Sequence, residues 1–125
     1  MSRIFKLYWN RKTAYIFDMI FKDLIELKDN RLIEITTSTY KIEFIKFGSW
    51  HEYGMIYENK AKYINSYRVN FHPYYRWDSY RSKHFEEKEQ GNAIYLFYQF
   101  IRDLCRYSDK QSHIFIKQKE LKDNE

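Results

Sequence analysis

Hydrophobic residues recur at helical spacing in two segments of the chain. In each segment the apolar positions follow one another at intervals that fit one face of a helix, and most charged residues fall on the other face. The first helix is predicted at about 14–28, with Thr13 as its N-cap. The second begins between Glu86 and Asn92 and ends before Ser108. The apolar positions that define the two helices are Ile16, Ile20, Leu24, Leu27, Ala93, Leu96, Phe97, Phe100, Ile101 and Leu104.

The remaining apolar runs are short and rich in Ile, Thr, Tyr and Phe, which is typical of strands. Residues 37–39 and 58–60 are polar and supply turns between them. Pro73 has no N–H to donate, so it should end the strand before it, and 72–84 is predicted to be an ordered loop. The predicted strands are 3–9, 31–37, 40–47, 52–58, 63–71 and 113–117.

Together these elements predict an α+β fold. An antiparallel sheet of about four to six strands would carry two amphipathic helices packed on one face. The length of 125 residues suits one domain, predicted at 1–120, with 121–125 as a flexible tail. Aromatic residues make up 21% of the chain, and each buried ring contributes a large apolar area to a small core.

The net charge of +5 favours a partner that carries negative charge. Nucleic acid, an anionic membrane and an acidic protein face all meet that condition. The excess is spread along the chain, however, and a compositional bias toward Lys, Ile, Asn and Tyr would give the same balance. Charge alone therefore does not decide the class of partner.

Cysteine usage and hydropathy indicate where the protein works. Cys105 is the single cysteine, so no intrachain disulfide can form, and its place in an apolar stripe predicts a small buried hydrophobe. The first residues lack an extended apolar run and a small-residue cleavage site, so no secretory signal is expected. No segment has the roughly 20 apolar residues that cross a bilayer. We expect a cytoplasmic protein without membrane insertion.

Several classes of enzyme lack their sequence motifs here. The three glycines are too scattered for a phosphate-binding loop, and one cysteine cannot form a paired-cysteine zinc site. The four histidines do not have the short spacing of a metal-binding helix, and no serine lies in a nucleophile elbow. We therefore expect no cofactor and no metal.

The segment 67–84 interleaves aromatic and basic residues more densely than any other part of the chain. Tyr, Trp and Arg are the usual anchors of protein interfaces, and the same residue types stack on bases and pair with phosphates in single-stranded nucleic acid. A purely structural role, with rings capping the core and arginines solvated, is the third reading of this pattern. The candidate binding residues are Arg68, His72, Tyr74, Tyr75, Arg76, Trp77, Tyr80, Arg81, Lys83 and His84.

The absence of catalytic motifs favours a non-enzymatic binding protein. Its expected role is to inhibit or neutralise a macromolecular partner, as immunity and anti-defence proteins do, with an acidic protein as the first choice of partner. A nucleic-acid-binding protein that uses the same residues is the alternative. A small metal-independent ribonuclease is a further alternative, because it needs only an acid, a base and cations around a phosphate. Its candidate groups are His72, His84, Arg76, Arg81 and Glu86. The sequence leaves the oligomeric state open.

Overall fold

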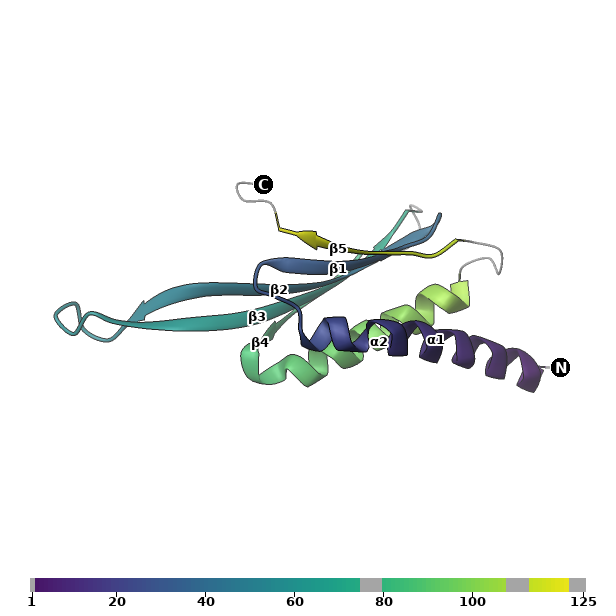
Figure 1. The fold of residues 1–125 in the computed structure, drawn as a ribbon, viewed down its shortest axis with the longest axis horizontal. Coiled ribbons are helices and arrows are strands. Elements are labelled where there is room, and N and C mark those ends of the chain that lie inside the picture. Colours follow the sequence, from purple (N-terminus) through teal and green to yellow (C-terminus); the bar gives the residue numbers. More distant parts are fainter. Residues whose placement is uncertain (1, 75–79, 108–112, 122–125) are drawn as a thin grey trace.

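The computed structural model describes residues 2–74, 80–107 and 113–121, which form a five-stranded antiparallel sheet and two α-helices. Both helices lie on the same side of the sheet, so the predicted α+β architecture is confirmed (Figure 1). The strand order is β4-β3-β2-β1-β5. In chain order the elements are α1 Ser2–Ile25, β1 Arg31–Thr36, β2 Tyr40–Tyr53, β3 Lys60–Pro73, β4 Arg81–Glu86, the 3-10 helix η1 Glu87–Glu89, α2 Gln90–Tyr107 and β5 Phe115–Glu120.

The core lies between the helix layer and the sheet. The two apolar stripes read from the sequence both face it, and Ile20, Leu24 and Phe97 are almost fully buried. Every second residue of the central strands points into the same layer, so Phe44 packs against Phe97 with ring centroids 5.7 Å apart. Cys105 is buried among these residues, as predicted. Among the described residues, no helix is long and apolar enough to cross a membrane.

The predicted first strand is wrong, because residues 3–9 belong to α1, which begins at Ser2. Thr13 is consequently no N-cap: it lies inside the helix and is buried. The apolar residues of 3–9 alternate only imperfectly, and pairs such as Ile4 and Tyr8 also stand four apart, as on a helix face. No Gly or Pro separates this segment from the following stripe, so the helix continues through it.

The hairpin of β2 and β3 is longer than the sequence indicated. Fourteen residue pairs join the two strands, from Tyr40 opposite Pro73 to Tyr53 opposite Lys60. The strand predicted at 52–58 is wrong, because β2 ends at Tyr53 and residues 54–59 form the turn. Gly54 and Asn59 have positive φ values of 90° and 50°, which reverse the chain inside a stretch that alternates like a strand.

The region around Pro73 also differs from the prediction. β3 includes Pro73, and the pairing continues beyond it, because the N–H of Tyr74 donates to the carbonyl of Thr39 at 2.9 Å. Residues 81–84, predicted as loop, belong to the edge strand β4. The candidate residues Tyr75, Arg76 and Trp77 lie outside the described residues.

The second helix and the last strand are close to their predicted positions. Glu86 and Glu89 form a capping box at η1, and α2 follows directly from Gln90. β5 begins at Phe115, two residues later than predicted, and pairs antiparallel with β1. The predicted tail begins with an ordered residue, since Leu121 N–H donates to the Asn30 carbonyl at 2.9 Å. Residues 122–125 lie outside the described part.

Candidate binding surfaces

The side of the sheet away from the helices, called here the open face, collects several of the candidate residues. Directly opposite residues of neighbouring strands place their side chains on the same face. Val69 and Phe71 point into the core, so Arg68, Asn70 and His72, which alternate with them along β3, point to the open face. The partners on the neighbouring strands continue these rows across the sheet.

A chain of hydrogen bonds links the open-face side chains of three strands. His72 Nε2 lies 2.5 Å from Glu43 Oε1, and Asn70 Nδ2 donates to the same oxygen at 3.3 Å. The Ser82 hydroxyl donates to Asn70 Oδ1 at 2.6 Å and accepts from Arg68 Nη1 at 3.0 Å. Each partner limits the motion of the next, so Arg68 and His72 are held in defined positions on a half-exposed surface.

Further basic residues and one ring surround this network. The Tyr80 ring lies 4.7 Å from the His72 ring, and Lys41 and His84 are the cross-strand partners of His72 and Arg68. We call this set the open-face cluster: Lys41, Arg68, His72, Tyr80 and His84. At the opposite edge of the sheet, β5 adds Phe115, Lys117 and Lys119 to the open face. Lys119 pairs with Glu34 at 3.0 Å.

The candidate residues Arg81 and Lys83 lie on the other face of β4. Arg81 is opposite Phe71, and its guanidinium lies 4.2 Å from the centroid of that ring and 3.4 Å from Asp103 Oδ2. Lys83 likewise covers the ring of Phe85, at 5.2 Å. These two cations cap the edge of the core, so the structure does not combine them with the open-face cluster. Tyr74 is exposed beyond the end of β3.

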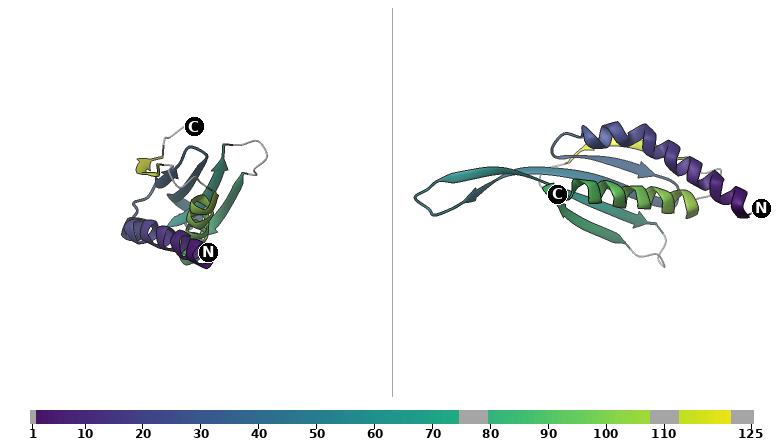
Figure 2. Two further views of the ribbon diagram at one scale, coloured as in Figure 1. Left: turned by 90° about the vertical axis from the view of Figure 1, so that its right-hand side faces the viewer. Right: turned by 90° about the horizontal axis from the view of Figure 1, so that it is seen from below.

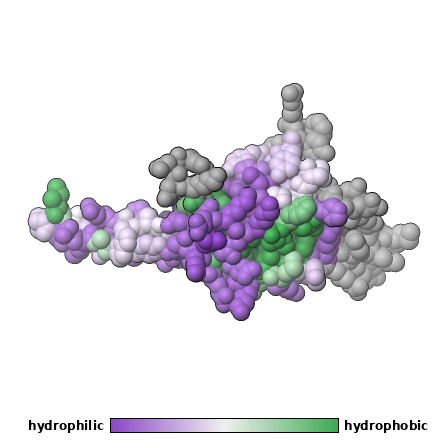
Figure 3. All heavy atoms as spheres, turned by 45° about the horizontal axis from the view of Figure 1, so that its top comes forward, coloured by the Kyte–Doolittle hydropathy of each residue, from purple (hydrophilic) through white to green (hydrophobic). Residues whose placement is uncertain are grey.

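The arm, residues 48–65, is the second surface and was not predicted. It comprises the outer halves of β2 and β3 with their turn, and it projects beyond the body of the molecule (Figures 1 and 2). Apolar atoms stand at its end (Figure 3), where the side chain of Ile56 is fully exposed. The exposed large hydrophobic residues of the arm are Trp50, Tyr53, Met55, Ile56, Tyr57 and Tyr63.

The root of the arm is attached to the loop between α1 and β1. Asn30, at a φ of 60°, accepts a hydrogen bond from Gly48 N at 3.2 Å and donates one to the Gly48 carbonyl at 3.3 Å. The Tyr63 hydroxyl donates to Asp29 Oδ2, and this bond raises the pKa of Tyr63. A Cβ on Gly48 would collide with that hydroxyl and lie 2.8 Å from the carboxyl carbon of Asp29.

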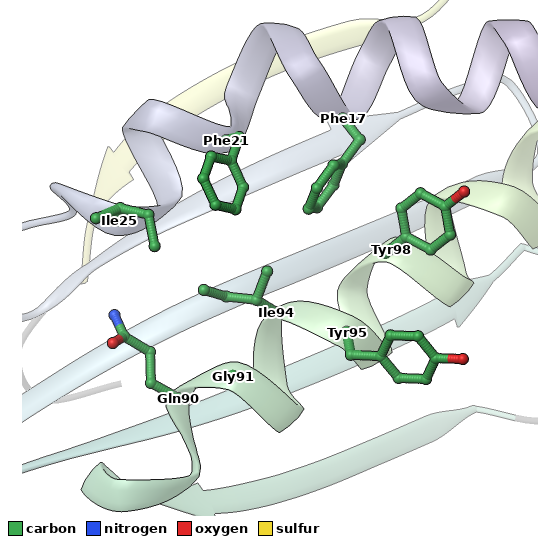
Figure 4. A pocket seen from close by; sticks show the side chains of 8 residues that line it. All are labelled: Phe17, Phe21, Ile25, Gln90, Gly91, Ile94, Tyr95 and Tyr98. Carbon is green, nitrogen blue, oxygen red and sulfur yellow. The ribbon is translucent and has the colours of Figure 1, made fainter.

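The third surface is a groove between the antiparallel helices α1 and α2, on the side away from the sheet. Phe17, Phe21 and Ile25 line one wall, and Ile94, Tyr95 and Tyr98 line the other (Figure 4). The hollow has a volume of about 540 Å³. Phe17 packs edge-on against Tyr98 at 5.1 Å. Gly91 lies at the end of the groove, and a Cβ there would meet no atom within 4 Å. We call this hollow the helix groove.

Of the groups named for the ribonuclease alternative, His84 and Glu86 line one hollow, His72 lies apart from it, and Arg76 lies outside the described residues. His72 and His84 share the open face, but His84 on β4 lies opposite Arg68, which precedes His72 by four residues on β3. At roughly 3.3 Å per residue this separates them by about 13 Å, too far to act on one phosphate. Arg81 points away from both. Within 2–74, 80–107 and 113–121, no group of three acidic, His or Cys residues could hold a metal ion.

Comparison with protein families, curated proteins and solved structures found no match. The function must therefore be inferred from the three surfaces of this chain alone. Of these, only the open face contains residues that the sequence indicated. Its other members, Lys41, Glu43 and Ser82, lie between 12 and 31 residues along the chain from their partners, and only the strand register brings them together.

Proposed function

We propose that the protein binds a macromolecular partner through the open-face cluster without catalysing a reaction. It would inhibit that partner by covering part of its surface. The role would be that of small inhibitors, immunity proteins or anti-defence proteins. The observation that carries the proposal is the network from His72 to Arg68. It presents the Arg68 guanidinium and the His72 ring, with Tyr80 beside His72, on a face that neither of the described α-helices covers. Side chains held before binding lose less entropy in a complex.

An acidic protein face is the preferred partner. Arg68 uses one Nη on Ser82 and keeps further N–H groups for a carboxylate, and Lys41 extends the positive region along the sheet. Glu43 and Glu34 lie in the same face. They would repel the continuous negative charge of a phosphate backbone more strongly than they would repel the separate carboxylates of an acidic protein. Tyr80, exposed at the rim, supplies an anchor of the type that interfaces favour.

Nucleic acid is the second candidate, supported by β5. Phe115 is exposed and alternates with Lys117 and Lys119 on the open face, so a ring and two ammonium groups lie along one strand. Bases stack on such rings while cations follow the phosphates. Binding of this kind weakens steeply as salt rises.

Charge reversal tests the surface directly. In a pull-down from the cells that express the protein, Arg68→Glu and Lys41→Glu together should remove a specific acidic protein from the bound fraction. Lys22→Glu and Lys28→Glu together, an equal change of charge at two exposed lysines away from the open face, should leave it bound. A partner retained by the open-face variant would exclude the proposed surface.

Fluorescence anisotropy with a mixed pool of short RNA and DNA oligonucleotides separates the two candidates. The protein-binding proposal requires no binding near physiological salt. Binding that falls as salt rises, and that Lys117→Glu with Lys119→Glu abolishes, would favour nucleic acid and count against the acidic protein.

A further inference from the structure

The helix groove is an apolar hollow that nothing in the described part of the chain covers. Its walls carry no charged residue, and Gln90 is the one amide among the lining side chains. Phe21 and Ile25 on α1 and Tyr95 on α2 are each at least 44% exposed beside it. An apolar surface of this kind, bordered by polar residues, marks a contact site in a soluble protein.

The end of the arm has the complementary character. Residues 53–57 contain no charged side chain, and Ile56 stands at the turn with its whole side chain in water. The two positive-φ residues Gly54 and Asn59 and the hydrogen bond of Glu58 N to the Met55 carbonyl, 2.8 Å, fix the shape of this turn. A rigid apolar tip costs little entropy when it enters a partner.

The positions of tip and groove allow two copies to exchange arms. The arm leaves the body at the end where α2 begins, the same end at which Gln90 and Gly91 border the groove (Figure 1). Six residue pairs beyond Phe47, at about 3.3 Å each, give the paired arm a reach of about 20 Å before the turn. With two molecules side by side in opposite directions, each arm would run along the helix layer of the other.

Charge favours this face for contact between copies. The whole chain carries +5, so most surfaces of two copies would repel each other. The tip and the groove walls are uncharged, and the bordering charges of α1 alternate in sign, as in Asp18, Lys22 and Asp23. The contact of residues 53–57 with the groove walls therefore brings no charged side chains together.

We propose that the protein self-associates as a two-fold dimer in which the arm tip of each copy, with Ile56 at its end, occupies the helix groove of the other. Stable interfaces bury roughly 1,600 Å² in total, which one tip cannot supply. The exchange forms the contact twice and adds the flanks of both arms. A closed two-fold arrangement also uses every tip and groove, which prevents open-ended filaments.

Sedimentation velocity of the full chain over a range of concentrations tests the dimer. Ile56→Asp would bury a carboxylate in the groove, and Gly91→Leu would fill the groove at a position where the monomer has free space. Each change should weaken the dimer at least about a hundredfold. Asn92→Leu, which adds the same side chain at the adjacent exposed position outside the groove lining, should leave it intact.

Mixing the two variants distinguishes arm exchange from other dimers. The Gly91→Leu copy keeps a good tip and the Ile56→Asp copy keeps an open groove, so one of the two contacts can form between them. Because a heterodimer keeps one intact contact and each homodimer keeps none, the mixture should contain more dimer than either variant alone at the same total concentration. A wild-type chain that is monomeric at all concentrations would overturn the proposal. So would a dimer that Gly91→Leu abolishes and Ile56→Asp leaves intact, since the helix layers would then pack directly on each other.

Discussion

Gly48 marks the point at which the arm joins the body. Its missing side chain lets the Tyr63 hydroxyl reach Asp29 across the strand, while Asn30 bonds both backbone groups of the glycine. Four residues from three segments therefore set the direction in which the arm leaves the sheet. The sequence indicated only that Gly48 interrupts a hydrophobic run.

Gly48→Ala should displace the Tyr63 hydroxyl and lower the urea midpoint of unfolding. Tyr63→Phe removes the same hydrogen bond, so it should cause a loss of similar size, and the double variant should be no less stable than the weaker single variant. Urea denaturation of the four proteins forms a double-mutant cycle. Fully additive losses would contradict the shared contact.

The Cys105 thiol is predicted to be unreactive in the folded protein. Burial raises its pKa above the ordinary value of 9.0, although a hydrogen bond with Thr13 and the charge of Lys12 act in the opposite direction. Only the thiolate is nucleophilic, so a disulfide reagent at neutral pH should react at least about a hundredfold faster after unfolding in urea.

The same shift predicts a dependence of stability on pH. Because the folded pKa is the higher one, the stabilising effect of the neutral thiol is complete below pH 9.0 and is lost as pH rises toward the folded pKa. Between these values wild type should lose more stability than Cys105→Ala. Equal losses in the two proteins would mean that Cys105 ionises as readily in the fold as in the unfolded chain.

At the scale of elements, the helical stripes could be predicted because burial on one face leaves a period that a single sequence displays. The prediction of a strand at 52–58 was wrong for the opposite reason. Tyr53, Met55 and Tyr57 occupy every second position, as in a strand with one buried face. The arm, however, is exposed to water on both sides, so this alternation does not reflect burial in a core. Gly54 and Asn59, which tolerate positive φ, decided the local structure instead. In residues 3–9 the spacing fitted both periods, and continuity with the following stripe decided for the helix.

Removal of the arm should leave the fold intact. No residue between Lys46 and Tyr67 belongs to the buried core, so replacement of 49–64 by an Asn-Gly turn removes little packing. The free energy of unfolding should change by about 1 kcal/mol or less, with circular dichroism retaining the helical signal. Dimers formed by the shortened chain would contradict the arm exchange, whereas a chain that fails to fold would show that the arm supports the sheet.

At the scale of the whole molecule, strand register decided the composition of the candidate site. The sequence could nominate 67–84 as one dense segment, because composition is local. It could not reveal that alternate residues of an edge strand face opposite sides, which places His84 with Arg68 but sends Arg81 to the core edge. Nor could it supply Lys41 or Glu43, which only the pairing of β2 with β3 brings beside His72.

The chain is predicted to unfold as one domain in a single transition, because both helices and four strands contribute to one core. Phe97→Ala should lower the free energy of unfolding by about 3–5 kcal/mol, since Phe97 is fully buried against Phe44. Near- and far-ultraviolet circular dichroism should shift together. Exposed Tyr95→Ala serves as the control, at a protein concentration low enough to keep the chain monomeric. Separate transitions would contradict the prediction of one domain.

The strand order has a consequence for synthesis on the ribosome. β1 emerges early, yet the neighbour on its outer side, β5, is among the last residues described. Until that strand leaves the exit tunnel, the nascent chain holds an unprotected row of backbone donors and acceptors next to Ile33 and Ile35. The growing polypeptide therefore passes through a stage at which chaperones, or wrong strands, can compete for that vacant place.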